Sequence, residues 1–323
     1  MKAMVRDVYG LPDVLEFRDV EKPVPGPGEA LVRVEAASVN TADLEHLRGE
    51  PRAARVATGW RRPRRKGVGF DVAGRVEAVG DEVRSLQPGD AVWADLFDSG
   101  GGAFAEWVSA PQEVFSPIPA GVPFDQAATI PHSAILALQG LTGRGPIEPG
   151  QTVLVIGAGG CVGPFAIQLA KAFGAEVTGV DHTGKLELMR TAGADHVIDY
   201  TKEDFAENGL RYDMILDIAA QRSLYVCRRS LAPRGRHALI ARSIGGLFGA
   251  AVVGAGISIA GSKRMGVFMW KPNNREDLVT LGRLLAAGEI KPLIDRSYPL
   301  SETPAALRYV DQGHARGKVI ITV

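Results

Sequence analysis

Residues 152–181, TVLVIGAGGCVGPFAIQLAKAFGAEVTGVD, constrain the fold more than any other part of the chain. A short apolar run at 152–156 leads directly into a cluster of glycines, and an amphipathic stretch over 162–173 ends at Gly174. A second apolar run at 176–180 follows and ends at Asp181. This order is typical of a strand, a tight turn, a helix and a second, parallel strand. The segment therefore predicts a doubly wound α/β sheet.

The same alternation continues toward the C-terminus. A helix is expected at 186–192, with Gly193 as its stop, and another at 276–287, with Gly288 as its C-cap. Further strands of the sheet are expected at 196–198, 214–217 and 238–241. Repeated strand–helix–strand order favours a parallel sheet with helices on its faces.

The N-terminal part has a different character. Apolar and polar residues alternate with period two at 30–37 and 71–79, and another strand begins within 89–93. One helix is expected at 41–48, and helices at 125–130 and 133–141 follow. Short strands separated by Gly and Pro predict a compact, barrel-like all-β unit. The final strand, 318–323, is expected to return to this unit, because chain ends often lie close together.

Composition excludes several classes of protein. Lys+Arg and Asp+Glu are both 37, so no global field attracts nucleic acid or an anionic membrane. Two cysteines, Cys161 and Cys227, are too few for a disulfide framework or a four-thiolate zinc site. The N-terminal sequence MKAMVRDVYG has no apolar signal region, so we expect a cytoplasmic protein. The glycine-rich run 244–261 is interpreted as loops and short strands, not a membrane span.

The glycine-rich turn indicates a ligand. Gly157 permits a sharp turn, Gly160 lets a pyrophosphate approach the backbone, and Gly163 lets the helix pack close to the strand. Unpaired N–H groups at the helix start would then bind the anion. A lone glycine motif is weak evidence, but the strand before it and the helix after it supply the required context. The turn therefore predicts a nicotinamide dinucleotide.

The choice between NADH and NADPH stays open at this level. Asp181, near the end of the second strand, would accept hydrogen bonds from the ribose hydroxyls of NADH. Thr183, Lys185 and Tyr200 instead offer the hydroxyls and the cation that a 2′-phosphate needs.

Motifs along the whole chain resemble the medium-chain dehydrogenase/reductase superfamily, in its zinc-independent quinone oxidoreductase-like branch. The resemblance rests on the segment 152–181 and on SVNTAD (38–43), GFDVAGRVEAVG (69–80), PGD (88–90), GGAFAEW (101–107), DHVIDY (195–200), YDMILD (212–217) and GKVI (317–320). It implies a GroES-like, partly open β-barrel domain from residues 1–122 and 290–323. It also implies a Rossmann domain with a doubly wound parallel sheet over 123–289.

The resemblance also addresses zinc. Asn40 stands where zinc-dependent relatives have their first cysteine ligand, and Phe70-Asp71 replaces a His-Glu pair. His132 alone does not complete a set of three protein ligands, and the four-cysteine zinc lobe is missing. We therefore expect no catalytic metal.

The resemblance places Asn40 beside the nicotinamide and Lys185 and Tyr200 at the 2′-phosphate. These positions favour NADPH, while Asp181 keeps NADH possible. The complete set of expected cofactor contacts is Asn40, Gly157, Gly160, Cys161, Val162, Gly163, Asp181, Thr183, Lys185, Tyr200, Ala219, Ile240 and Phe268.

The predicted activity is hydride transfer to a conjugated carbonyl: a quinone, an enone or an enoyl thioester. Asn40 would donate a hydrogen bond to the developing oxyanion, and His46 or His132 would deliver a proton. The simpler interpretations are a buried asparagine that ties two loops together and structural histidines. Alternative functions are a non-catalytic dinucleotide-binding regulator and a metal-free NAD(P)-dependent alcohol or carbonyl oxidoreductase.

Two features suggest partners. Phe268 and Trp270 lie in an expected edge strand, which would pair with its twin in a homodimer. The one basic run is either a solvated loop or a patch that binds the phosphate of a coenzyme A or carrier-protein substrate. Its members are Arg61, Arg62, Arg64, Arg65 and Lys66.

Overall fold

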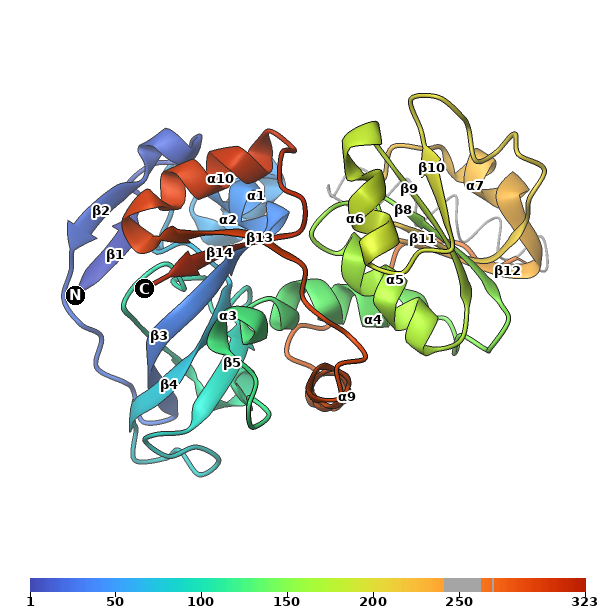
Figure 1. The fold of residues 1–323 in the computed structure, drawn as a ribbon. Helices are drawn as coiled ribbons and strands as arrows, with labels where there is room; N and C mark the ends of the chain where they lie inside the picture. The colour runs from blue at the N-terminus through green and yellow to red at the C-terminus, as the bar shows by residue number, and fades with distance from the viewer. Residues whose placement is uncertain (241–262, 269) are drawn as a thin grey trace. The chain divides into compact units, whose positions relative to one another are not determined.

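The computed structural model describes residues 1–240, 263–268 and 270–323 (Figure 1). The chain forms two compact units, which are described separately. Unit 1 comprises Met1–Ile135, Pro272–Ala287 and Ile294–Val323, and unit 2 comprises Leu136–Lys271 and Gly288–Leu293. The expected loops at 244–261, and residue 241 of an expected strand, lie outside the described residues.

Unit 1 is built around an antiparallel sheet of seven strands. Its order is β13-β14-β3-β4-β5-β7, with β6 paired to β3 and only the β13–β14 pair parallel. The strands are β3 (Glu29–Val39), β4 (Asp71–Val79), β5 (Ala91–Asp95), β6 (Trp107–Pro111), β7 (Ser116–Pro117), β13 (Ile294–Pro299) and β14 (Lys318–Thr322). A separate hairpin-like pair joins β1 (Lys2–Val5) to β2 (Glu16–Asp19). Because β14 pairs with β3, the C-terminal segment completes the N-terminal sheet, as expected.

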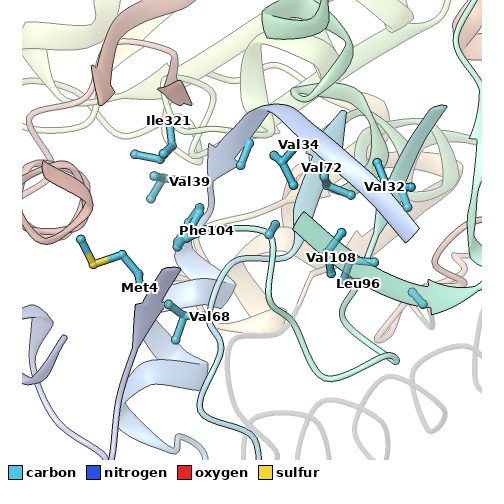
Figure 2. Packing of buried hydrophobic residues seen from close by; sticks show 14 of the residues in the cluster. Met4, Val32, Val34, Val39, Val68, Val72, Leu96, Phe104, Val108 and Ile321 are labelled. Atoms are coloured by element: carbon cyan, nitrogen blue, oxygen red, sulfur yellow. The ribbon is translucent and has the colours of Figure 1, made fainter. Parts of the chain in front are cut away.

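The helices of unit 1 are short. They are α1 (Thr41–Arg48), α2 (Arg55–Thr58), α3 (Phe124–Ala127), α9 (Arg275–Ala286) and α10 (Thr303–Asp311), with a π-helical turn at Ile130–Ala134. The periodicity located α1 and β4 correctly, because clear punctuation, Asn40 before α1 and Gly80 after β4, bounds them. Figure 2 shows the core of this unit, where Val32, Val34, Val72 and Phe104 pack among other buried side chains.

Unit 2 has a five-stranded, fully parallel sheet in the order β10-β9-β8-β11-β12. Its strands are β8 (Thr152–Ile156), β9 (Glu176–Asp181), β10 (His196–Asp199), β11 (Tyr212–Asp217) and β12 (Leu231–Leu239). Its helices are α4 (Ile135–Thr142), which starts at the boundary, α5 (Gly163–Ala172), α6 (Leu186–Thr191) and α7 (Leu224–Ser230). Figure 1 shows α5 and α6 side by side on this sheet. The predicted doubly wound sheet is confirmed.

One strand and the domain boundaries differ from the expectation. The strand predicted at 238–241 begins earlier, at Leu231. Pro233 and Gly235 are typical of a turn and concealed this earlier start, but they lie inside the strand, at an irregularity where Arg234 has φ 64°. Residues 123–135 and α9 also belong to unit 1, whereas the expected Rossmann domain ran from 123 to 289.

Candidate functional site

The glycine-rich turn of unit 2 needs glycine at two positions for steric reasons. Gly157 has φ +82°, a left-handed conformation that side chains rarely adopt, and a Cβ there would lie 3.2 Å from the backbone nitrogen of Ala219. A Cβ on Gly163 would lie only 2.1 Å from the carbonyl oxygen of Ala158. These two glycines therefore allow the close passage from β8 into α5.

The outer side of the turn is open. Gly160 is exposed, and a Cβ there would meet only the carbonyl oxygen of Gly157, at 3.4 Å. Val162, the N-cap of α5, provides no side-chain cap, so no cap side chain competes with an anion for the N–H groups of the first turn, although Pro164 in that turn has none. The turn thus fits the pyrophosphate of a dinucleotide. Cys161 is partly exposed beside it, and Val162 is buried.

The residues expected at the adenosine ribose lie at the carboxyl ends of β9 and β10. The Asp181 carboxylate accepts hydrogen bonds from the N–H groups of Gly159 and His182, both at 2.7 Å. A Cβ on Gly159 would lie 2.4 Å from the Cβ of Lys185, so Lys185 starts directly beside the turn. Tyr200 is 57% exposed, and the Thr183 hydroxyl donates to Asp199. One edge of the sheet therefore carries both the carboxylate expected to bind ribose hydroxyls and the cation and hydroxyls expected to bind a 2′-phosphate.

Three further expected cofactor contacts also belong to unit 2. Ala219 lies against Gly157, and the N–H of Ile240 donates to the carbonyl oxygen of Asp217 at 2.9 Å. The N–H of Phe268 donates to the carbonyl oxygen of Leu239 at 3.0 Å, and Val267 forms a parallel bridge with Leu239. Two isolated bridges, Arg236 with Arg264 and Leu239 with Val267, therefore place this segment beside β12, and the edge strand expected at Phe268 and Trp270 stays a prediction.

Unit 1 contains a buried polar group that we call the Asp71 cluster. It joins the ends of β3, β4, β5 and β14, the start of α1 and the π-helical turn. Its members are Ser38, Asn40, Asp71, Asp95, His132, Ser133 and Lys318, each less than 9% exposed. The Asp71 carboxylate accepts from the Ser38 hydroxyl at 2.7 Å and from the His132 N–H at 2.8 Å, and it lies 3.5 Å from the Lys318 ammonium.

Asn40 occupies the centre of this cluster. Its Nδ2 donates to Asp71 at 2.9 Å, while its Oδ1 accepts from Ser133 at 3.0 Å and from Lys318 Nζ at 2.6 Å. Its backbone N–H donates to Asp43 at 2.7 Å. These bonds join four separate segments of the chain, which is the role of a buried structural asparagine. The predicted contact between Asn40 and the nicotinamide stays a prediction.

His132 is held by a carboxylate. Its Nδ1 lies 2.7 Å from Asp95 Oδ2, and Asn273 in turn brackets the Asp95 backbone through two hydrogen bonds of 2.9 and 2.7 Å. Burial lowers the pKa of His132, but the Asp95 and Asp71 carboxylates raise it by more than burial lowers it. The net shift of the pKa is upward. The Asp95–His132 pair therefore favours the protonated imidazolium form of His132.

His46 has the opposite character. Its ring stacks on Phe70 with centroids 5.1 Å apart, and Phe70 contacts Phe97 edge-on at 5.1 Å. Burial and the nearby Arg6 lower the pKa of His46 to about 4. His46 is therefore neutral at pH 7, and of the two predicted proton donors His132 has the suitable electrostatics.

Reasoning from the sequence missed several members of the Asp71 cluster as site residues: Ser38, Asp95, Ser133 and Lys318. Ser38 and Lys318 lie in the motifs SVNTAD and GKVI, which supported the family resemblance without a role for either side chain. Lys318 is 278 residues from Asn40 in sequence, so only the pairing of β14 with β3 brings them together.

The basic run lies on the surface of unit 1. Arg61, Arg62, Arg64, Arg65 and Lys66 are exposed, as is Trp60 at 71%. Arg65 donates to the carbonyl oxygen of Ser99, and Lys66 pairs with Asp7 at 2.7 Å. Part of this run is therefore fixed against its own unit.

Two family models match the chain. One, described as alcohol dehydrogenase GroES-like domain, matches residues 26–120, and the other, described as zinc-binding dehydrogenase, matches residues 192–321. The chain is 32% identical over 332 residues to 2-methylene-furan-3-one reductase of Solanum lycopersicum, which covers 99% of this chain and 79% of that protein. It is 30% identical over 332 residues to NADPH-dependent alkenal/one oxidoreductase, chloroplastic, of Arabidopsis thaliana, with the same coverage.

A solved structure agrees with these relatives. The quinone oxidoreductase from Coxiella burnetii superposes with a TM-score of 0.87 at 27% identity, and the match covers 100% of this chain and 99% of that one. The fold is thus that of a two-domain dehydrogenase or reductase with a GroES-like and a Rossmann part. The chain belongs to the medium-chain dehydrogenase/reductase superfamily, in its quinone oxidoreductase-like branch. Among the helices that the structure describes, none has the length and apolar character needed to cross a membrane.

Proposed function

We propose that this NAD(P)H-dependent oxidoreductase transfers hydride to a conjugated carbonyl, prefers NADPH and uses no zinc in the reaction. The observation that carries the proposal is the position of the Lys318 ammonium, which contacts Asn40 Oδ1 at 2.6 Å and Ser133 Oγ at 3.0 Å beside Asp71. A metal ion at Asp71 would need these same oxygen atoms. In this chain they lie beside the Lys318 ammonium, which supports a reaction without a metal ion at this cluster.

The preference for NADPH is supported by the edge of the sheet in unit 2. The Asp181 carboxylate accepts one N–H group at each oxygen, from Gly159 and His182, so the turn uses part of its hydrogen-bonding capacity. Lys185 lies beside that turn, and the exposed Tyr200 follows β10. A cation and a hydroxyl at this edge suit a 2′-phosphate. One relative is itself named as NADPH-dependent.

The chemistry requires a proton as well as a hydride. A bound nicotinamide dinucleotide supplies the hydride to an electron-poor carbon, and negative charge then develops on the substrate oxygen. We assign the proton to His132, because Asp95 fixes Nδ1 and the raised pKa favours the imidazolium form. Asn40 Nδ2, already a donor to Asp71, orients the same cluster.

The deciding experiment is an NADPH-oxidation screen against a quinone, an enone and an enoyl thioester. The proposal expects turnover with at least one of them, which persists after dialysis against a chelator. NADPH binding without any turnover would instead favour the non-catalytic regulator. Turnover that is lost with the chelator and restored by zinc, in both wild type and Cys227→Ser, would contradict the zinc-independent reaction.

The basic run supports a finer proposal about the substrate. Arg61 and Arg62 are exposed next to Trp60, and this arrangement would suit the phosphates and adenine of a coenzyme A handle. The double variant Arg61→Ala/Arg62→Ala should raise KM for an enoyl-coenzyme A while leaving KM for a small enone unchanged. Equal changes of KM for both substrates would instead identify the basic run as a solvated loop.

The segment 264–268 supports the proposed homodimer, because isolated bridges and backbone hydrogen bonds place it beside β12 at the edge of the sheet of unit 2. A second copy would add its own edge to this sheet. Light scattering at micromolar concentration should give twice the chain mass of 34.3 kDa. A monomer would contradict the proposal.

The cytoplasmic location also remains a proposal, because the Arabidopsis thaliana relative is named as chloroplastic. A fluorescent fusion of the full chain in its own cells, with fractionation as a second measure, tests it. Signal confined to an organelle would contradict it.

A further inference from the structure

A second buried polar group, which we call the Asp217 cluster, lies in unit 2. Asp217 ends β11, Cys227 lies in α7 and His237 lies in β12. All three are 0% exposed, and their ligand atoms (carboxylate oxygen, Sγ and ring nitrogen) lie within 4.8 Å of one another. Among the described residues, these three side chains form a group whose ligand atoms lie close enough to share one metal ion.

The fold explains why these residues meet. In the parallel register His237 lies opposite Ile215, and Asp217 lies two residues farther along β11. Residues two apart on a strand point to the same face of a sheet, so Asp217 and His237 share a face. The helix α7 connects these two strands and packs its Cys227 into the core on that side.

The polar atoms of this cluster are left unsatisfied. Asp217 Oδ2 and both ring nitrogens of His237 are buried without a hydrogen-bond partner among the described residues. His237 Nε2 lies 3.9 Å from Asp217 Oδ2, which is too far for a hydrogen bond. Buried polar atoms in native proteins are nearly always paired, so these three atoms point to a bound ligand.

We propose that the Asp217 cluster binds a transition-metal ion, with zinc as the ion that the donor set fits. Thiolate, imidazole and carboxylate are the ligands that zinc takes in proteins. With metal–ligand bonds of about 2.0–2.3 Å, ligand atoms of a tetrahedral site stand roughly 3.3–3.8 Å apart, so the side chains need only small rotations inward. A bound water would complete the four-coordinate shell.

The charges of the ligands also suit a buried ion. Binding releases the proton of the Cys227 thiol to solvent as the sulfur–metal bond forms. The thiolate and the Asp217 carboxylate then neutralise the two positive charges of the ion, so the complex is neutral overall. A neutral complex is far less costly to bury than either charged ligand alone.

The cluster is connected to the glycine-rich turn by a short loop. The other oxygen of Asp217, Oδ1, accepts from the N–H of Ala220 at 2.9 Å, and Ala220 has φ 54°. Ala219, in between, lies against Gly157. An ion on Asp217 would therefore fix the loop that contacts the dinucleotide-binding turn, which gives the site a structural role within unit 2. This role does not depend on the proposed function.

Cobalt titration of the metal-free full-length protein tests the proposal. Co²⁺ is expected to bind with one equivalent per chain, to give a thiolate-to-cobalt charge-transfer band and tetrahedral d–d bands, and to be displaced by Zn²⁺. Cys227→Ser should lose the charge-transfer band, and His237→Gln should weaken binding at least roughly a hundredfold. The matched controls Cys161→Ser and His196→Gln should keep both the band and the affinity, because Cys161 lies in the turn and His196 pairs with Glu176 at the surface.

The wild-type titration decides the matter even if a core variant fails to fold. A wild-type protein without the charge-transfer band would overturn the proposal and leave a buried water as the partner of the three atoms. A band that survives Cys227→Ser, or that disappears in Cys161→Ser, would place the ion elsewhere and also overturn it. These readouts need no NADPH turnover, so they are separate from any failure of the proposed function.

Discussion

The two buried polar clusters each contain an aspartate and a histidine, but they differ in how their polar atoms are paired. In the Asp71 cluster of unit 1, the Asp71 carboxylate faces the Lys318 ammonium, and Asn40 and Ser133 fill the remaining positions. In the Asp217 cluster of unit 2, a carboxylate, an imidazole and a thiol meet, and no hydrogen bond joins these side chains to one another or to other described residues through Asp217 Oδ2 or the His237 ring. The difference is that the first cluster contains a cationic side chain of the chain itself, Lys318, beside its carboxylate, whereas the second cluster brings together three potential metal ligands.

The largest expected effect comes from removing that partner. Lys318→Met would leave Asp71 buried beside Asn40 without its ammonium, because the Lys318 side chain is only 2% exposed. Breaking a buried ion pair on one side typically lowers the free energy of unfolding by about 3–5 kcal/mol. Urea unfolding followed by circular dichroism measures this loss.

A surface pair provides the control for Lys318. Lys171 pairs with Asp195 at 2.7 Å, with side chains 36% and 35% exposed, so Lys171→Met should cost about 1 kcal/mol or less. Equal losses for the two variants would mean that the Asp71 cluster is not held together by its ammonium.

The next largest expected effect tests whether the Asp71 cluster also takes part in catalysis. His132→Gln removes the imidazole that Asp95 orients, and loss of a general acid typically lowers kcat by about 10²–10⁴-fold. The pKa of His132 is raised, and the imidazolium donor exists below that pKa. Wild-type kcat should therefore fall as pH rises through the raised pKa, while the residual kcat of His132→Gln should not follow this step. Steady-state NADPH oxidation across pH 5.5–9 measures both.

Two variants sharpen the assignment of His132. Asp95→Asn should keep the fold but shift the pH step downward, because the carboxylate that raises the pKa of His132 is gone. His196→Gln, at an exposed pair with Glu176, should leave the profile unchanged. A wild-type pH profile in His132→Gln would show that the cluster is purely structural.

The incomplete cluster should gain stability from outside the chain. If zinc binds the folded state alone, a free concentration a hundred times its Kd adds about 2.7 kcal/mol to the free energy of unfolding. Wild type should therefore unfold at a higher Tm with zinc, and Cys227→Ser should not. Differential scanning fluorimetry with and without zinc measures this difference. Zinc that raises the Tm of both proteins equally would remove the contrast between the two clusters.

The sequence predicted the scaffold of both clusters but neither cluster itself. The bounds of α1, β4 and β8 followed from periodicity and from punctuation by Gly and Asn, which act locally. The Asp71 cluster depends on the pairing of β14 with β3, so no local sequence pattern predicts that Lys318 belongs to it. Asp217, Cys227 and His237 are ten residues apart in turn, a spacing with no metal-binding signature; the register of β11 and β12 creates their meeting. Motifs such as GFDVAG were visible, but the pairing of charges arises only in the folded chain.

The smallest expected effect is at the edge of the sheet in unit 2, where the Lys185 cation is expected to contact the 2′-phosphate of the ligand. Lys185 starts beside Gly159, whose N–H group donates to the Asp181 carboxylate. Losing one charge-assisted contact to the 2′-phosphate should raise the Kd for NADPH about tenfold, or about 1.4 kcal/mol, in Lys185→Ala. The Kd for NADH, which has no such phosphate, should stay within about twofold. Fluorescence titration of the two nucleotides measures the ratio, and Lys202→Ala is the matched control, because its ammonium lies 3.5 Å from Asp199. Parallel losses for NADPH and NADH would assign Lys185 to the packing of the turn and would make Asp181 the ribose partner after all.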